Sequence, residues 1–172
     1  MNKPSQPHIA KPEDIFSELS FGEQIFLWGV RIWVNGYKNN SNIQDLLRSA
    51  FTNACVPRAH AGLDTMMEMI TTAGCGVMDV RCPSCSKISE DEHRLMAAIA
   101  AWQHGSGLCD GDVYLQCWAR PAILRILRPI VRMLAQALKE GGFFIRPRPW
   151  SLHQLITEMK STTSTVQSIT IH

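Results

Sequence analysis

Residues 20–34 read SFGEQIFLWGVRIWV, and this stretch predicts the central helix of the fold. Ser20, with Glu23 three positions later, has the spacing of a capping box, in which both side chains satisfy free amides at a helix start. The apolar residues that recur at helical spacing behind this start are Phe21, Ile25, Trp28 and Ile32. A helix that is apolar nearly all round lies in the centre of a core or is shared with a second subunit. We therefore expect a central helix, ended by Asn35-Gly36 and the run at 38–40, and a protein partner or homodimer.

The rest of the chain repeats the helical period in several segments. Apolar residues recur at three and four positions over 43–54, 58–72, 90–102 and 121–138, and a shorter helical segment is expected at 113–119. The alternating prolines of residues 143–150 forbid a helix and predict an extended arm. The predicted fold class is all-α: a single helical bundle of about five core helices with a Cys-rich loop and an extended C-terminal arm.

Length and composition are those of one globular domain. The chain has 172 residues, of which 45% are hydrophobic and 19% charged. We expect a flexible leader at 1–12, a helical domain at 13–159 and a mobile tail at 160–172, because the leader is rich in proline and the tail in Ser and Thr.

The six cysteines and the absence of a long apolar run indicate the cellular compartment of the protein. Residues 1–20 lack a signal-peptide pattern, and no apolar run reaches the length needed to cross a membrane. Cysteines in a chain without a secretory signal favour reduced thiols or metal ligands over a disulfide framework. We expect a cytoplasmic protein with no membrane association.

Residues 75–93 read CGVMDVRCPSCSKISEDEH and lie between two predicted helices. The C-P-S-C turn at 82–85 can point two thiolates at one metal ion. If the flanking helices are antiparallel neighbours, Cys75 and His93 lie at the same end of the bundle as this turn, whereas Cys109 lies roughly 22 Å away. We therefore predict a structural zinc site, with all four coordination positions filled by Cys75, Cys82, Cys85 and His93.

The sequence of this loop also allows other interpretations. The turn resembles half of a zinc-knuckle or rubredoxin-type turn, although Ser86 stands where those turns usually have glycine. Thiolates also hold iron–sulfur clusters, so an Fe–S cluster is the alternative cofactor. A thiol-based redox sensor and a metal-dependent enzyme with an open coordination position are the other functional alternatives.

A basic segment provides a second candidate surface. Residues 120–148 contain seven basic residues and one acid, whereas the whole chain has a net charge of only +2. A basic stripe on a helix can follow phosphates, although a solvated helix face has the same pattern. The predicted basic binding face consists of Arg125, Arg128, Arg132, Arg146 and Arg148.

The functional prediction is a small zinc-binding regulatory or adaptor protein that acts by binding another macromolecule. The partner is a protein or a second copy of the chain, with nucleic acid as a second candidate. No G-x-S-x-G, H-E-x-x-H, P-loop or G-x-G-x-x-G pattern occurs, so no catalytic residue is predicted and an enzyme is the less favoured reading.

Overall fold

The structure is a bundle of α-helices. The computed structural model describes residues 15–105 and 111–147, and within these ranges every regular element is helical. A short 3₁₀ helix at Phe16–Glu18 precedes α1 (Phe21–Lys38), α2 (Gln44–Asn53), α3 (Pro57–Ala73), α4 (Glu90–His104), α5 (Asp112–Leu115) and α6 (Pro121–Glu140). The predicted all-α bundle of about five core helices is confirmed, because all but α5 are at least ten residues long.

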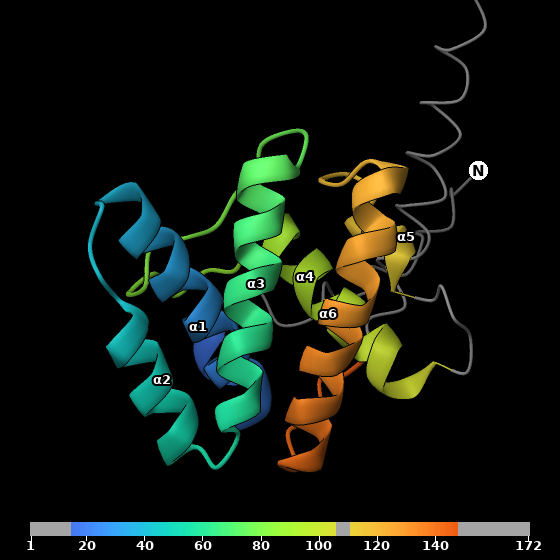
Figure 1. The fold of residues 1–172 in the computed structure, drawn as a ribbon. Helices are drawn as coiled ribbons and strands as arrows, with labels where there is room; N and C mark the ends of the chain where they lie inside the picture. Colours follow the sequence, from blue (N-terminus) through green and yellow to red (C-terminus); the bar gives the residue numbers. More distant parts are fainter. Residues whose placement is uncertain (1–14, 106–110, 148–172) are drawn as a thin grey trace, which may run out of the picture.

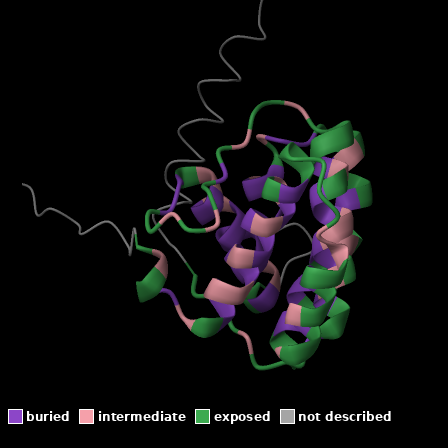
Figure 2. Ribbon diagram, turned by 90° about the vertical axis from the view of Figure 1, so that its left-hand side faces the viewer, coloured by how far each residue is buried: buried purple, intermediate pink, exposed green. Residues whose placement is uncertain are grey.

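Helix α3 lies in the middle of the assembly (Figure 1). It packs most extensively against α6, which in turn packs against α4, while α1 and α2 cover its other side. The buried residues of the helices point inward and the exposed ones outward (Figure 2). The main neighbour of α3 is therefore α6.

Helix α1 begins as predicted. The Ser20 amide donates to Glu23 Oε2 at 2.9 Å, and the Glu23 amide donates to Ser20 Oγ at 3.3 Å, which completes the capping box. The helix runs through Gly36, where a Cβ would lie 2.4 Å from the Ile43 side chain. Glycine at this position therefore allows the segment that leads into α2 to pack closely against α1.

The buried face of α1 differs from the predicted stripe. Phe26, Leu27 and Val30 are completely buried, whereas Phe21 is 63% exposed. A nearly all-apolar helix carries no polar face to orient it, so contacts with α2, α3 and α4 decide which side points inward. In the predicted helical segment at 58–72 the apolar positions do face the core, since Leu63, Met66, Met67 and Ile70 of α3 are all buried.

The chain around α5 and α6 completes the bundle. Helix α5 covers only part of the segment predicted at 113–119. After α6 the chain turns at Gly141 and packs back on the bundle, where Ile145 is fully buried and its amide donates to Gln103 Oε1 at 2.8 Å. The expected leader at 1–12, the tail at 160–172 and the arm beyond residue 147 lie outside the described residues.

No helix in the described part of the chain is both long and apolar enough to cross a membrane.

Candidate functional site

The loop between α3 and α4, which we call the cysteine loop (residues 74–89), is held by a buried ion pair. Arg31 of α1 and Glu92 of α4 both have side chains that are 0% exposed. Arg31 Nε donates to Glu92 Oε1 at 2.7 Å and Nη2 donates to Oε2 at 3.0 Å. This two-pronged geometry is the strongest form of an arginine–carboxylate contact.

The remaining polar atoms of this pair are used by the cysteine loop itself. Arg31 Nη1 donates to the Cys85 carbonyl at 2.5 Å, and Nη2 donates to the Lys87 carbonyl at 2.9 Å. Glu92 also accepts from the Arg81 amide at 3.1 Å. Buried charges are tolerated when they are paired and hydrogen-bonded, so the loop backbone is part of what makes this pair stable.

Local sequence explains why Glu92 is available for these contacts. Ser89 and Glu92 form a second capping box, with the Glu92 amide donating to Ser89 Oγ at 3.1 Å. The helix start favours a carboxylate through its unsatisfied amides and its dipole. Asp91 in the same turn accepts from the Asp79 amide at 2.7 Å, which ties a second point of the loop to α4.

Cys82 and Cys85 form a disulfide at the surface of this loop. Cys82 is exposed and Cys85 is half-buried, and the Cys85 amide donates to the Cys82 carbonyl at 3.0 Å. The C-x-x-C pair therefore closes a tight turn, as its spacing predicts, but the two sulfurs are bonded to each other.

The structure does not bring the four predicted zinc ligands together. Within residues 15–105 and 111–147, no three His, Cys, Asp or Glu residues form a group that could hold a metal ion. Cys75 lies beside the segment between α5 and α6, where its amide donates to the Trp118 carbonyl at 2.7 Å. His93 is only 2% exposed in the first turn of α4. The prediction assumed that α3 and α4 are antiparallel neighbours, whereas α3 packs most extensively against α6.

The predicted basic face is divided by two ion pairs. Arg128 pairs with the buried Asp112, and Arg146 donates to Glu23 Oε2 at 2.7 Å. Arg125 and Arg132 are exposed on α6, and Arg148 lies outside the described residues. Two of the five predicted arginines are therefore already paired with a carboxylate of the same chain.

Two hollows adjoin the C-terminal half of α1. The first, which we call the loop hollow, has a volume of about 250 Å³ and is walled by α1, α3, the cysteine loop and Trp118. Its lining residues are Trp33, Val34, Tyr37, Lys38, Met67, Ile70, Thr71, Gly74, Cys75, Gly76, Met78, Val80 and Trp118. Lys38 is the single charged residue in this lining.

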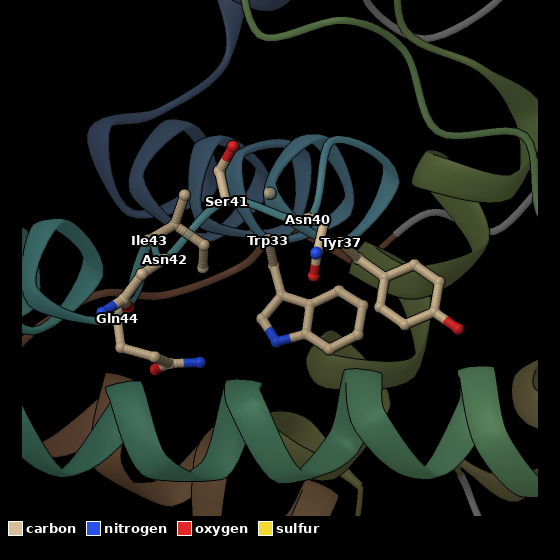
Figure 3. Close-up of a pocket in the computed structure, with 8 residues that line it drawn as sticks. Trp33, Tyr37, Asn40, Ser41, Asn42, Ile43 and Gln44 are labelled. Atoms are coloured by element: carbon tan, nitrogen blue, oxygen red, sulfur yellow. The ribbon is translucent and has the colours of Figure 1, made fainter.

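The second, which we call the amide hollow, has a volume of about 410 Å³ and is more open. Its lining residues are Trp33, Gly36, Tyr37, Asn40, Ser41, Asn42, Ile43 and Gln44 (Figure 3). The rings of Trp33 and Tyr37, which border both hollows, stack with centroids 5.4 Å apart. Figure 3 shows the Trp33 indole between α1 and α3, with Tyr37 beside it.

A chain of hydrogen bonds fixes the position of the Trp33 ring. The Trp33 Nε1 atom donates to Asp64 Oδ1 at 2.7 Å, and Gln44 Nε2 donates to the same oxygen at 2.7 Å. Gln44 Oε1 in turn lies 2.9 Å from His60 Nε2. The wall shared by the two hollows is thus held by α2 and α3 as well as by α1.

The free thiols differ in their surroundings. Cys55 is exposed, whereas Cys75 and Cys117 are half-buried. Burial raises the pKa of the Cys117 thiol, although a hydrogen bond and the charge of Arg94 oppose this shift. Burial therefore disfavours the thiolate of Cys117, which is the nucleophilic form.

The buried arginine and its partner were missed by sequence reasoning. Arg31 interrupts an otherwise apolar stretch and Glu92 completes a capping box, and each has a local explanation. The signal that could have found them is the position of Arg31 on a helix that is otherwise apolar, since a charge placed there must be paired. The partner lies 61 residues away in the chain, and no local pattern identifies it.

Comparison of the chain with protein-family models, with curated protein sequences and with solved structures finds no match.

Proposed function

We propose that this protein is a thiol-based redox-responsive regulatory protein that acts by binding another macromolecule, with Cys82 and Cys85 as its switch. The observation that carries the proposal is the connection between this pair and the core. The disulfide closes an exposed turn, and the carbonyl of Cys85 accepts from the completely buried Arg31.

The chemistry of the switch is thiol–disulfide exchange. Two molecules of a small thiol such as glutathione reduce the pair: the Cys82–Cys85 bond breaks, each protein sulfur gains a proton, and the two small thiols become one disulfide. Exposure of Cys82 supports this step, because exchange requires access of the attacking thiolate to a sulfur atom.

Opening of the turn would alter the contacts that hold the loop. With the disulfide broken, residues 82–85 gain conformational freedom, and the Cys85 carbonyl no longer has a fixed position opposite Arg31. Arg31 belongs to the same helix as Trp33 and Tyr37, so a change at the loop can reach the hollows at the end of α1. Redox state and surface shape are coupled in this way.

The favoured partner is a protein or a second copy of this chain. Arg128 and Arg146 are engaged in ion pairs, which leaves fewer cations for phosphates than the sequence predicts and makes nucleic acid the weaker candidate. Zinc remains the competing proposal for the reduced pair, because two thiolates three residues apart can begin a zinc site if the loop rearranges.

The test compares the oxidised and reduced full-length chain. The protein is equilibrated in glutathione buffers that span the cellular range of about −320 to −180 mV, and labelling of Cys82 and Cys85 is measured by mass spectrometry. Hydrogen exchange at the Arg81 amide, which donates to Glu92, reports the state of the loop. Sedimentation velocity reports self-association, and the Cys55→Ser variant is the matched control for thiol labelling.

We expect reduction within this range, faster exchange at Arg81 and a change in association state. A disulfide that stays closed throughout, or identical exchange and mass in the two states, would overturn the proposal. About one tightly bound zinc per reduced chain, lost in the Cys82→Ser/Cys85→Ser variant, would replace the redox switch with a structural zinc site.

A further inference from the structure

The loop hollow is lined mostly by apolar residues. Met67, Val80 and Trp118 in its lining are buried, and most of the other lining residues are apolar. Pockets that bind small molecules are mostly apolar, with a few polar groups that orient the ligand. The loop hollow has this character, and Lys38 supplies its single charge.

Among the described residues, the charge of Lys38 lacks a carboxylate partner. In the part of the chain that the structure describes, no Asp or Glu oxygen lies within ion-pair distance of Lys38. Its place as the last residue of α1 is also explained by the helix dipole, which favours a cation at this end. A cation at the edge of an apolar hollow is complementary to a ligand with an anionic group and an apolar body.

The size of the hollow limits the ligand. Its volume of about 250 Å³ lies below the roughly 300–1,000 Å³ of pockets that hold drug-sized molecules. The hollow therefore suits a single ring or a short branched chain. Met67 and Met78 add adaptable walls, since methionine side chains adjust to irregular shapes.

We propose that the loop hollow binds a small organic carboxylate with an aromatic or branched apolar body. The carboxylate lies against Lys38, and the apolar body lies between α3 and the cysteine loop, in contact with Trp118. This inference goes beyond the redox proposal and does not depend on it, although the two share the cysteine loop. Binding is therefore measured separately on the oxidised and the reduced chain.

The first experiment uses phenylacetate and its neutral analogue phenylacetamide as probes of the full-length protein. Isothermal titration calorimetry measures affinity, and the indole N–H resonances in NMR spectra report contact with Trp33 and Trp118. We expect phenylacetate to bind up to about fivefold more tightly than phenylacetamide, because an ion pair with the exposed Lys38 contributes at most about 1 kcal/mol. Lys38→Gln should remove this preference, whereas the matched change Lys87→Gln, outside the lining, should leave it intact.

Cys75 provides a second readout that does not depend on Lys38. Its thiol lines the loop hollow, whereas Cys55 is exposed and lies outside the lining. Bound phenylacetate should slow maleimide labelling of Cys75 and leave the labelling rate of Cys55 unchanged. Thr71→Trp, which places a large ring at the hollow, should reduce both binding and protection.

Equal affinity for phenylacetate and phenylacetamide, absence of binding to either folded redox form, or equal slowing at Cys55 and Cys75 would overturn the inference. These results would leave the redox proposal standing, because that proposal is tested by thiol titration and hydrogen exchange. If phenylacetate binds the Lys38→Gln variant as tightly as the unchanged protein, the proposed carboxylate site in the loop hollow is likewise overturned.

Discussion

Two glutamates, Glu92 at the cysteine loop and Glu23 at the C-terminal arm, have the same local role and different surroundings. Each is the third residue of a helix and closes a capping box with a serine, and each has a side chain that is 0% exposed. Each also binds an arginine that is distant in the sequence. Arg31, the partner of Glu92, is 0% exposed, whereas Arg146, the partner of Glu23, is 46% exposed.

The comparison shows that one local motif can anchor two different tertiary contacts. A capping box places a carboxylate at a helix start, where free amides and the helix dipole stabilise its charge. Burial of that carboxylate then requires a cation, and the arginine meets the requirement in both places. The exposure of the arginine decides how much free energy the contact contributes, because water screens a partly exposed charge.

The largest expected effect comes from breaking the buried pair. Arg31→Met should lower the free energy of unfolding by about 3–5 kcal/mol, since it leaves Glu92 charged and buried without its partner. Urea denaturation measures this change. The matched control is Arg48→Met, whose exposed pair with Asp45 should contribute about 0–1 kcal/mol. If the two variants lose the same free energy of unfolding, burial does not make the Arg31–Glu92 pair more stabilising than the Arg48–Asp45 pair.

A smaller effect is expected at the C-terminal arm. Arg146→Met should cost about 1–2 kcal/mol, because hydrogen bonds to the buried Glu23 are lost while the amide of residue 146 still donates to it. The loss measured by denaturation should shrink in high salt, whereas that of Arg31→Met should not. A salt-independent loss as large as that of Arg31→Met would contradict the comparison.

Removal of the disulfide tests how far the cysteine loop depends on the ion pair alone. Relative to the oxidised protein, Cys82→Ser/Cys85→Ser should lose about 1–2 kcal/mol, because a disulfide across so short a loop constrains the unfolded chain only modestly. Thermal unfolding measures the change. The buried pair should keep α1 and α4 together in the variant while residues 82–85 gain conformational freedom. Global unfolding of the variant at room temperature would show that the disulfide, and not the Arg31–Glu92 pair, stabilises the bundle at the cysteine loop.

The smallest expected effect is the dependence of stability on alkaline pH. Burial raises the pKa of both Cys117 and Tyr114 above their ordinary values of 9.0 and 10.0. On raising the pH, the unfolded chain therefore loses the protons of Cys117 and Tyr114 before the folded protein does. The free energy of unfolding keeps its full value below pH 9 and falls as the pH rises through the folded-state pKa values. Denaturation at pH 8 and pH 10 measures the fall, and Cys117→Ala should reduce it. A free energy of unfolding that stays the same or rises between pH 8 and pH 10 would contradict the raised pKa values of Cys117 and Tyr114.

The helices and their starts could be predicted because their causes are local. Both capping boxes, the amphipathic stripes of α3 and α6, and the break at Pro57 follow from spacings of a few residues. The length of the segment at 113–119 and the buried face of α1 could not be predicted, because they depend on which helices lie nearby. The zinc prediction assumed that α3 and α4 are antiparallel neighbours, whereas α3 packs most extensively against α6.

Neighbouring residues alone specify the helical class, the helix starts and the tight turn of Cys82 and Cys85, since each depends on backbone geometry over a few residues. The contacts of Glu92 with Arg31 and of Glu23 with Arg146 exist only in the folded bundle, as does the hollow that Lys38 and Cys75 share. Those contacts join residues from separate helices and loops. They arise when burial of apolar surface brings the elements together and every buried charge must find a partner.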